Sequence, residues 1–550
     1  MRKHLRTLLC LLLLSCLLCV SVYAAKETGT ELVMTCTGIL QTGGFPEPSS
    51  PIATQSLLLQ PQSSPENWKA AKEALRAGMM ELAETVDLQQ YEIPAEDAKK
   101  LYTEVVNDNP ELFYASAYFT QGRGKYVPYI NPKYSVNGEV DKIRVLYEWE
   151  KEILRQQRKA LEQKVEEIVD QVDTRWTDLE KALYLHDYII SRGRYDTEKT
   201  KDDELRRDAY NMLVNGIGVC QGYTMAYNLL LKKVGIPAGW VSSSELKHIW
   251  SLVQIDEKWY HTDLTWDDPL TDGSDRIGRV CHTYFCISGT KMQAGGHAAD
   301  DWVSSVDDPA ADTTFDAQYW ESIESAIVPI DRKWYYLENE LVENPQLQIV
   351  IDQKNKLMET SELTNAGHVV KVIDGFWPEL GSDLEYFGFF SGLSDYSGKL
   401  VYNTYEAVYS YEIATGETEK LYTLRDDEKQ KSGYIYGTTV TENVLQYSLN
   451  AEPNVAGTRK KCRLDSYIYV RGGYAYYLEN GHTLFLRRSA AETSGHVIAA
   501  WYDAEGRMLG VRFLTGRELT VDLSGAAAAK IFSTDQSFAP RTFPLLQQAG

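Results

Sequence analysis

Cysteine is scarce in this chain of 550 residues, which has eight, and three of the eight fall close to the N-terminus at Cys10, Cys16 and Cys19. The remaining cysteines are Cys36, Cys220, Cys281, Cys286 and Cys462. Five is too few for a disulfide-dense scaffold, and an odd number in an exported protein fits one free thiol with at most two disulfides. The alternative is that all five are free and packed as small apolar side chains.

Long hydrophobic runs are also scarce. The one long run in the sequence extends from Leu8 to Val22, near the N-terminus. Arg2, Lys3 and Arg6 precede it, and Val22-Tyr23-Ala24 has the small-residue form of a cleavage site. This pattern predicts a signal peptide over residues 1–24, a secreted or cell-surface protein, and a mature chain without a membrane span. Two alternatives are an uncleaved anchor and a lipoprotein modified at Cys16, which would leave a hydrophobic remnant at the new terminus.

Positive charge is in short supply, with 56 Lys and Arg against 78 Asp and Glu and a net charge of −22. Loss of the three signal-peptide cations takes the charge to −25. A nucleic-acid partner is therefore not expected, and a neutral or cationic polymer is more compatible. A composition with 43% hydrophobic and 24% charged residues is that of a folded protein, and the length suggests roughly two to four domains.

The part of the chain before residue 175 is predicted to begin with an extended lead-in over residues 25–65, which is rich in Thr, Ser, Pro and Gly. Residues 66–174 are predicted to form a helical N-terminal region, with a hairpin within 126–147. After it, Thr177 and Glu180 form a capping box for a helix that carries His186 on its apolar face. We interpret His186 as a packed residue at the edge of the core.

The C-terminal half changes to short alternating strands separated by turn residues. Residues 326–480 are predicted to form an antiparallel β domain with propeller-like repeats, too few to close a ring. Residues 481–550 are predicted to form a small β-sandwich module. Contact with a glycan or a cell wall is one function for these β domains, and a passive spacer is the alternative.

The residues around Cys220 indicate a reactive cysteine. Gly218 and Gly222 flank it and allow a tight turn into a helix that stops at Gly235. A thiol at a helix N-terminus ionises more readily, because the helix dipole and the free N–H groups stabilise the thiolate. The same N–H groups, with that of Gln221 nearest, can receive the oxyanion of a tetrahedral intermediate.

Two strands follow this helix, at 248–255 and 259–264, joined by a tight turn. Their antiparallel pairing is predicted to bring His248 and Asp263 together, with the helix presenting Cys220 beside them. A thiol, an imidazole and a carboxylate in this order form the activated nucleophile used for acyl transfer.

Three stretches of sequence resemble the motifs of one family: Gly218-Val219-Cys220-Gln221-Gly222-Tyr223, His248-Ile249-Trp250, and Trp259-Tyr260-His261-Thr262-Asp263-Leu264-Thr265-Trp266-Asp267. Together they resemble the transglutaminase-like superfamily, whose papain-like fold carries a Cys-His-Asp triad. The resemblance covers about residues 175–290 and includes a closing core strand at 283–288. It implies an α+β protein with a catalytic domain at 175–325 and no cofactor. The preceding segment at 110–114 resembles parts of exported multidomain bacterial proteins that carry this domain.

Further residues near the predicted triad are interpreted as its supports. Tyr195 resembles a family tyrosine near the oxyanion site, with core packing as the alternative, and Trp250 and Trp266 are interpreted as walls of a cleft. His261 could rival His248 as the base, but we favour a supporting or substrate-contacting role because it shares a strand with Asp263.

A metal site is not predicted. The ligand types are present, in Cys220, His248, Cys281, His282 and Cys286. Their spacing fits no zinc pattern, however, and the side chains of Cys281 and His282 would point to opposite faces of a strand.

The reaction is left open by the sequence, since the superfamily includes peptidases, amidases, cross-linking acyltransferases and inactive members. We expect a protein or peptide substrate, with cell-wall peptide as one candidate. Hydrolysis is favoured because it needs only water, and no acceptor site for an amine is evident. The alternatives are a cross-linking acyltransferase and a non-catalytic binding or adhesion protein.

Overall fold

A computed structural model describes residues 63–548 except 116–130, 135–137, 146, 148, 198–205, 269, 272–273, 345–348, 379–384, 388–391, 442, 451–457, 465–467, 471–473, 480–481, 489–494, 539 and 541–544. The predicted signal peptide, almost all of the predicted lead-in and Cys36 lie outside the described residues. The same holds for part of the predicted hairpin.

The N-terminal region has a core of its own. Helices α2 (Pro65–Met80) and α3 (Ala98–Asp108) pack together, and strands β1 (Thr85–Asp87), β3 (Val140–Arg144) and β2 (Asn131–Tyr134) form an antiparallel sheet beside them. Their apolar side chains form one cluster. The two helices and the pairing of β2 with β3 confirm the expectation of a helical region with a hairpin.

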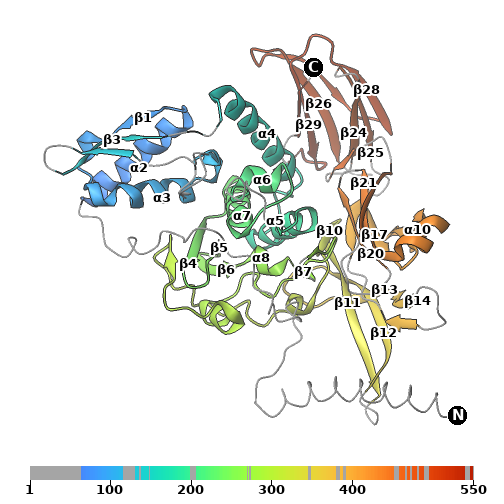
Figure 1. Ribbon diagram of the computed structural model, residues 1–550. Coiled ribbons are helices and arrows are strands. Elements are labelled where there is room, and N and C mark those ends of the chain that lie inside the picture. Colours follow the sequence, from blue (N-terminus) through green and yellow to red (C-terminus); the bar gives the residue numbers. More distant parts are fainter. Residues whose placement is uncertain are drawn as a thin grey trace.

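The long helix α4 (Lys151–Val169) joins this region to the rest of the molecule. Leu154, near its start, belongs to the N-terminal core, whereas Leu161 and Val165 belong to the next core. Figure 1 shows α4 running from the N-terminal region toward the centre of the molecule. Because one continuous helix is buried in both cores, the two parts are held together through packing.

The central part is built around α7 (Cys220–Lys233), which is buried on nearly every side. It packs on α5 (Asp178–Arg192), on α6 (Ala209–Leu213) and on strand β5 (His248–Ile255). The antiparallel sheet has the order β6-β5-β4-β9, in which β4 is Ala238–Ser243, β6 is Lys258–Thr262 and β9 is Val303–Ser304. Because α7 is buried along most of its length, it is the central helix of this domain (Figure 1), and Cys220 at its start packs against the edge of the core.

The predicted capping box is present, since Thr177 accepts a hydrogen bond from the backbone of Glu180 and the Glu180 side chain accepts one from the backbone of Thr177. The predicted strand at 283–288 is wrong. Its pairing is limited to a bridge between His261 and Ile287, because Cys286 has a φ of 52°, in the left-handed region that interrupts an extended chain.

Smaller elements connect the core sheet to the C-terminal half. They are α8 (Leu264–Asp267), β7 (Leu270–Thr271), β8 (Ser274–Asp275), α9 (Gly289–Met292), the helical turn Gln293–His297 and the 3-10 helix Tyr319–Ser322.

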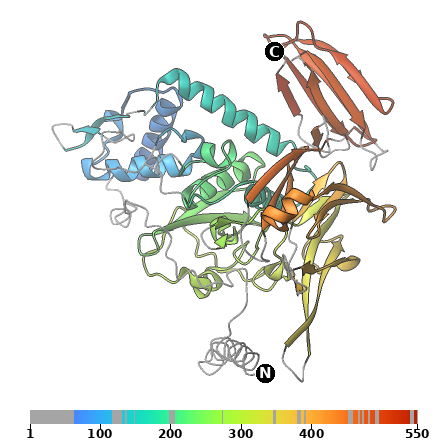
Figure 2. The same cartoon turned by 45° about the vertical axis from the view of Figure 1, so that its right-hand side comes forward.

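The C-terminal half consists of antiparallel sheets that stand in a column beside the helical part (Figures 1 and 2). The first sheet is β10 (Val328–Ile330), β11 (Lys333–Asn344), β12 (Ile349–Thr360) and β13 (His368–Asp374). The short pair β14 (Phe376–Pro378) and β15 (Glu385–Phe387) follows. The next sheet is β16 (Leu393–Tyr396), β17 (Lys399–Asn403), β18 (Ala407–Tyr411) and β19 (Thr418–Thr423). Helix α10 (Asp426–Ser432) leads to β20 (Tyr434–Thr441), β21 (Val444–Asn450) and β22 (Thr458–Arg463).

These sheets are not a detached module, because one hydrophobic cluster runs from Leu161 in α4 to Tyr411 in β18. The chain also approaches closely at Gly278, where a Cβ atom would lie 2.1 Å from the carbonyl oxygen of Thr438 in β20. Gly278 has a φ of +79°, so both the space and the backbone require glycine there. The sheets are therefore docked on the central domain through its own core.

The last module has two facing four-stranded sheets. One has the order β23-β24-β25-β28 (Ile468–Val470, Tyr474–Glu479, Thr483–Arg488, Glu518–Asp522) and the other β27-β26-β29-β30 (Met508–Phe513, His496–Tyr502, Ala528–Thr534, Leu545–Gln548). They enclose a separate apolar core, which is the packing expected of a β-sandwich. The first sheet begins at Ile468, upstream of the boundary predicted at residue 481.

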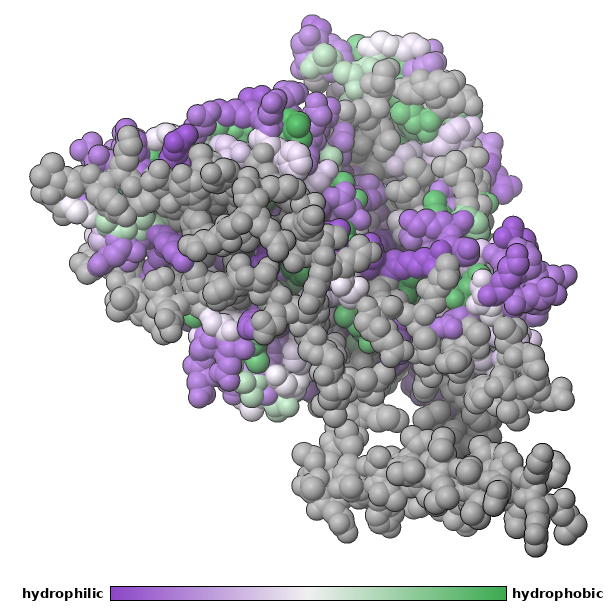
Figure 3. Space-filling model, in the orientation of Figure 1, coloured by the Kyte–Doolittle hydropathy of each residue, from purple (hydrophilic) through white to green (hydrophobic). Residues whose placement is uncertain are grey.

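The face of the molecule drawn in Figure 3 is mostly hydrophilic where it is coloured, with hydrophobic residues scattered over it. Within the described ranges, none of the helices combines the length and the apolar character needed to cross a membrane.

Candidate active site

Cys220 is the first residue of α7 and is half-buried, with Val219 as the residue before the helix. The loop before α6 lies directly against this turn, because the N–H of Val219 donates to the carbonyl oxygen of Arg206 at 3.0 Å. A Cβ atom on Gly222 would lie 2.9 Å from the same oxygen. Glycine at position 222 therefore allows the close approach that places the thiol at the helix N-terminus.

The pKa of the Cys220 thiol is lowered. Burial by itself would raise this pKa, but the hydrogen bond with His248 and the charge of that ring outweigh burial, with help from the charge of Arg207 and from the N–H of Ile249. The same surroundings stabilise a thiolate, which is the nucleophilic form of cysteine. The predicted acidic thiol thus has a specific imidazole partner in the fold.

His248 opens β5 and is buried, and its Nε2 lies 2.6 Å from Oδ2 of Asp263. Since Nε2 is engaged by the carboxylate, Nδ1 is the ring nitrogen left for Cys220. Burial would lower the pKa of His248, but the charge and hydrogen bond of Asp263 and then the interaction with Cys220 raise it to about 10. The ring is therefore held as an imidazolium between an anion on each side.

Asp263 lies just beyond the strand on which it was predicted, because β6 ends at Thr262. Oδ1 of Asp263 accepts hydrogen bonds from the N–H groups of Thr265 at 2.9 Å and Trp266 at 3.3 Å, so the residue caps the short helix α8. Despite burial, His248 and then His297 hold the pKa of Asp263 well below its usual range. Helix capping, and not strand alternation, thus fixes this carboxylate.

The two tryptophans differ in their exposure. Trp250 is 1% exposed and stacks against His248, with ring centroids 5.7 Å apart, so its interpretation as a cleft wall is wrong. Trp266 is half-buried, and its ring lies 5.9 Å from that of His248. The structure therefore places Trp250 beneath the histidine and leaves Trp266 at the edge of the site.

His261 is buried, and its Nδ1 accepts a hydrogen bond from Nε1 of Trp250 at 2.9 Å. Burial, and then the nearby His297, lower the pKa of His261 to about 3. A neutral ring that accepts from Trp250 fits the supporting role predicted for it. With 4% exposure it is too buried for the predicted alternative of contact with substrate.

Tyr195 and Gln221 are the two residues predicted to support the oxyanion. The backbone of Tyr195 forms a bridge with Gly218, and burial and then the charge of Cys220 raise the pKa of its hydroxyl, which keeps it protonated. The side chain of Gln221 instead turns to Asn107 of the N-terminal region, with Nε2 3.4 Å from Oδ1. Only the backbone N–H of Gln221 is thus left for the predicted oxyanion role.

His297 is a site residue that the sequence reasoning missed. Its Nε2 lies 2.8 Å from Oδ2 of Asp263, the oxygen that also binds His248. The residue follows Gly295-Gly296 at the end of a helical turn. The sequence did carry one signal for His297: a pair of glycines directly before a histidine, a short distance after the predicted triad.

A second buried cluster of histidines and aspartates lies apart from the cysteine. His186 is fully buried, with Nδ1 2.8 Å from Asp187 and Nε2 3.2 Å from Asp267. Nε2 of His282 donates to the same Asp187 oxygen at 3.0 Å. We name His186, Asp187, Asp267 and His282 the buried quartet. It confirms that His186 is a packed and satisfied residue.

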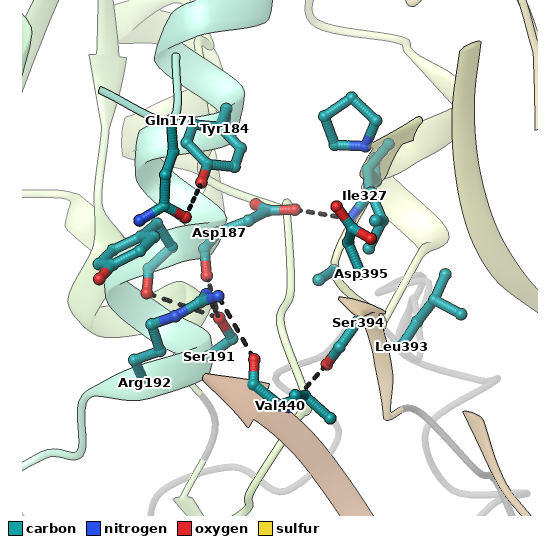
Figure 4. Close-up of a pocket in the computed structure, with 14 residues that line it drawn as sticks. Gln171, Tyr184, Asp187, Ser191, Arg192, Ile327, Leu393, Ser394, Asp395 and Val440 are labelled. Carbon is teal, nitrogen blue, oxygen red and sulfur yellow. Dashed lines mark hydrogen bonds between the residues drawn. The ribbon is translucent and has the colours of Figure 1, made fainter. Parts of the chain in front are cut away.

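Asp187 of the buried quartet borders a cavity of about 60 Å³ between α5, β10, β16 and β20. Figure 4 shows Asp187 pointing across this cavity to the backbone N–H of Ile327, which donates to Oδ2 of Asp187 at 2.7 Å. Arg192 reaches from α5 to the carbonyl oxygen of Val440 in β20. The quartet therefore anchors the start of the C-terminal sheets to the central domain.

Metal ligation is geometrically conceivable at two groups of the described side chains: His186 with Asp187 and His282, and His248 with Asp263 and His297. In both groups the nitrogen-to-oxygen distances are 2.6 to 3.0 Å, which are hydrogen-bond lengths. Hydrogen bonding alone therefore accounts for both groups.

Residues 163–264 match the transglutaminase-like superfamily. Cys220, His248 and Asp263 all fall within the matched stretch, whereas His297 lies beyond it. Residues 163–264 form a transglutaminase-like domain. The protein as a whole has an α+β fold with this core and C-terminal antiparallel β sheets.

Among solved structures, a TGase is 15% identical over 26% of this chain and 45% of its own length, with a TM-score of 0.19. The chain therefore spans less than half of that protein. The extracellular domain of a hybrid two-component system from B. thetaiotaomicron is 8% identical over 54% of this chain and 48% of that one, with a TM-score of 0.17. Red sea bream transglutaminase is 7% identical over 75% of this chain and 87% of that one, with a TM-score of 0.15. No curated protein matches the sequence.

Proposed function

We propose that this protein is an exported cysteine-nucleophile enzyme that cleaves an amide or peptide bond through a thioester acyl-enzyme. The observation that carries the proposal is the placement of His248, which lies 2.6 Å from Asp263 and whose ring lowers the pKa of the Cys220 thiol. A nucleophile, a base and an orienting carboxylate in contact are the arrangement that acyl transfer requires. The predicted signal peptide supports export, and a peptide of protein or cell-wall origin is the proposed substrate.

The first step is attack of the Cys220 thiolate on the amide carbonyl, which forms the carbon–sulfur bond. Negative charge then develops on the carbonyl oxygen, and the N–H groups of the first turn of α7, including that of Gln221, are placed to receive it. The imidazolium of His248 gives its Nδ1 proton to the departing amine as the carbon–nitrogen bond breaks. Asp263 keeps the ring oriented and stabilises its positive charge.

The second step releases the acyl group. Neutral His248 takes a proton from water, the resulting hydroxide attacks the thioester carbonyl, and the thiolate leaves to restore the thiolate–imidazolium pair. An amine in place of water would give transfer and cross-linking. Hydrolysis is the proposed outcome because it requires no acceptor site besides the triad.

The test of the proposal is the reactivity of Cys220 toward a low concentration of iodoacetamide, read by peptide mass spectrometry. Cys286 is an internal control, since burial raises the pKa of its thiol to about 12. We expect Cys220 to be alkylated far faster than Cys286 at pH 7 and to lose this advantage in His248→Ala. Slow alkylation of Cys220 that is indifferent to His248 would contradict the proposal and favour a binding or adhesion protein.

The reaction itself is read in a second experiment, in which the protein is incubated with a peptide library and an added primary amine. Products that gain water indicate hydrolysis, and products that gain the amine indicate transfer. Both should vanish in Cys220→Ala. Amine adducts in excess over hydrolysis products would replace the hydrolase by the cross-linking acyltransferase.

A further inference from the structure

The carboxylate of Asp263 binds two imidazole rings through a single oxygen. Oδ2 lies 2.6 Å from Nε2 of His248 and 2.8 Å from Nε2 of His297. Oδ1 is taken by two backbone N–H groups of α8. Asp263 therefore accepts four hydrogen bonds, and one of them comes from a histidine that does not touch the thiol.

The protonation of His297 follows from its surroundings. The ring is fully buried, and its Nδ1 has no hydrogen-bond partner in the part of the chain that the structure describes. A neutral ring protonated at Nε2 donates to Asp263 and leaves only an acceptor at Nδ1 unpaired, whereas an imidazolium would bury an unpaired and charged N–H donor there instead. Burial also lowers the pKa of His297, and its contact with Asp263 offsets this only in part.

Aromatic side chains hold this ring in place. The ring centroid of His297 lies 4.1 Å from that of Trp266 and 5.0 Å from that of Trp250. The hydroxyl of Tyr284 donates to the carbonyl oxygen of Gly295, and Nε1 of Trp302 donates to that of His297. The ring therefore has one orientation, fixed from both the side chain and the backbone.

Gly296 allows this placement. Its φ is +110°, and a Cβ atom there would lie 2.9 Å from Cζ3 of Trp266. Glycine is required by the backbone conformation and by the space. The turn at Gly295-Gly296 thus delivers His297 to a carboxylate that lies 34 residues earlier in the sequence.

We infer that His297 is a positioning residue of the catalytic site: a neutral hydrogen-bond donor that keeps Asp263 ionised and aimed at His248. This inference rests on the proposed function. The titratable groups facing His297 are His248 from β5, His261 from β6, Asp263 and Tyr284. Since a hydrogen bond to the charged form of a carboxylate favours that form, loss of the donor makes Asp263 easier to protonate.

The test compares His297→Gln, which keeps an N–H donor, with His297→Phe, which keeps an aromatic ring without one. The measured quantity is the rate constant for alkylation of Cys220 as a function of pH. We expect the acid-side decline to move upward by about one pH unit in His297→Phe, hence an about tenfold slower reaction at a fixed acidic pH. We expect His297→Gln to stay close to the unmodified protein.

Superimposable profiles for all three proteins, or equal shifts in both variants, overturn the inference. In either case a wild-type thiol that still depends on His248 leaves the proposed function standing, so the two failures are distinguishable. Because His297→Phe can unfold the site, NMR of the wild-type protein with labelled histidine provides a second measurement. It should show His297 as a neutral ring with its proton on Nε2, and a ring protonated on Nδ1 overturns the inference.

Discussion

Two buried clusters of histidine and aspartate lie in the same domain, and they differ in what stands at their edge. In the proposed catalytic cluster, His248 and His297 share Asp263, and His248 also interacts with the half-buried thiol of Cys220. In the buried quartet, Asp187 is shared by His186 and His282, and its other oxygen accepts from a backbone N–H. The first cluster thus contacts a thiol, whereas the buried quartet contacts a backbone N–H group.

The comparison shows that buried histidines and aspartates alone do not distinguish a candidate active site from a structural cluster. Both clusters are buried, and in both the pKa of one histidine is raised by carboxylates in spite of burial, to about 10 for His248 and to about 9 for His186. The quartet connects α5 with the segment that starts the C-terminal sheets, so its ion pairs hold domains together. In the proposed catalytic cluster, the raised pKa of the histidine instead serves to stabilise the thiolate of Cys220.

The largest expected difference between the clusters is in activity. Asp263→Asn keeps the size of the side chain but removes the charge that orients His248, and we expect peptide cleavage to fall by about 10⁴-fold. The matched change Asp187→Asn should leave cleavage by the folded protein within a few-fold. Steady-state kinetics at pH 7 measures both, and equal losses would contradict the division of roles.

The next difference is in stability. Asp187→Ala leaves the ring N–H groups of His186 and His282 and the N–H of Ile327 without their acceptor. We expect the free energy of unfolding to fall by about 3–5 kcal/mol, as when one partner of a buried ion pair is removed. Urea unfolding followed by tryptophan fluorescence measures it. The control is His297→Gln, which should lower the free energy of unfolding far less.

The pH dependence of stability should reflect both clusters, because the pKa values of His186 and His248 are both raised, and a substitution of His186 isolates the share of the buried quartet. The hydrogen bonds of His186 with Asp187 and Asp267 outweigh burial and raise its pKa from 6.5 to about 9. A raised pKa contributes stability that is complete below the unfolded value and is lost as the pH rises through the folded one. We therefore expect the unfolding temperature to decline between about pH 6.5 and pH 9.

The control for this decline is His186→Gln, in which the slope over the same pH range should flatten. The carboxylates affect stability at acidic pH instead. The pKa of Asp187 is lowered by its two histidines although burial opposes them, so its contribution is present above the unfolded value and is lost as the pH falls. A decline at alkaline pH that is unchanged in His186→Gln would assign it to other groups.

The smallest effect is expected from a change at Trp250, which stacks against His248. Trp250→Phe keeps the stacking on His248 but removes the N–H that donates to Nδ1 of His261. We expect a loss of about 1–3 kcal/mol in the free energy of unfolding, because a buried acceptor loses its partner. The alkylation rate of Cys220 should change little. A large drop in that rate would mean that His261 is coupled to the triad.

Local sequence patterns determined the core of the candidate site. Glycines around Cys220 and the apolar pattern after it require a helix that starts at the thiol, and alternation with a tight turn requires the hairpin that carries His248. These signals act within a few residues, so spacing along the chain predicts them. The helix at 220–233 and the strand at 248–255 both have the predicted starting residues.

The tertiary structure alone decided the rest. His297 reaches Asp263 from 34 residues away, and Asp187 meets His282 from 95 residues away. The predicted strand at 283–288 failed because Cys286 adopts a left-handed backbone conformation, for which no signal stood in the sequence. Contacts between distant residues depend on how whole elements pack, and packing is not encoded in any short pattern. The sequence therefore predicted the candidate triad of Cys220, His248 and Asp263, and only the tertiary structure showed that His297 shares the carboxylate of Asp263.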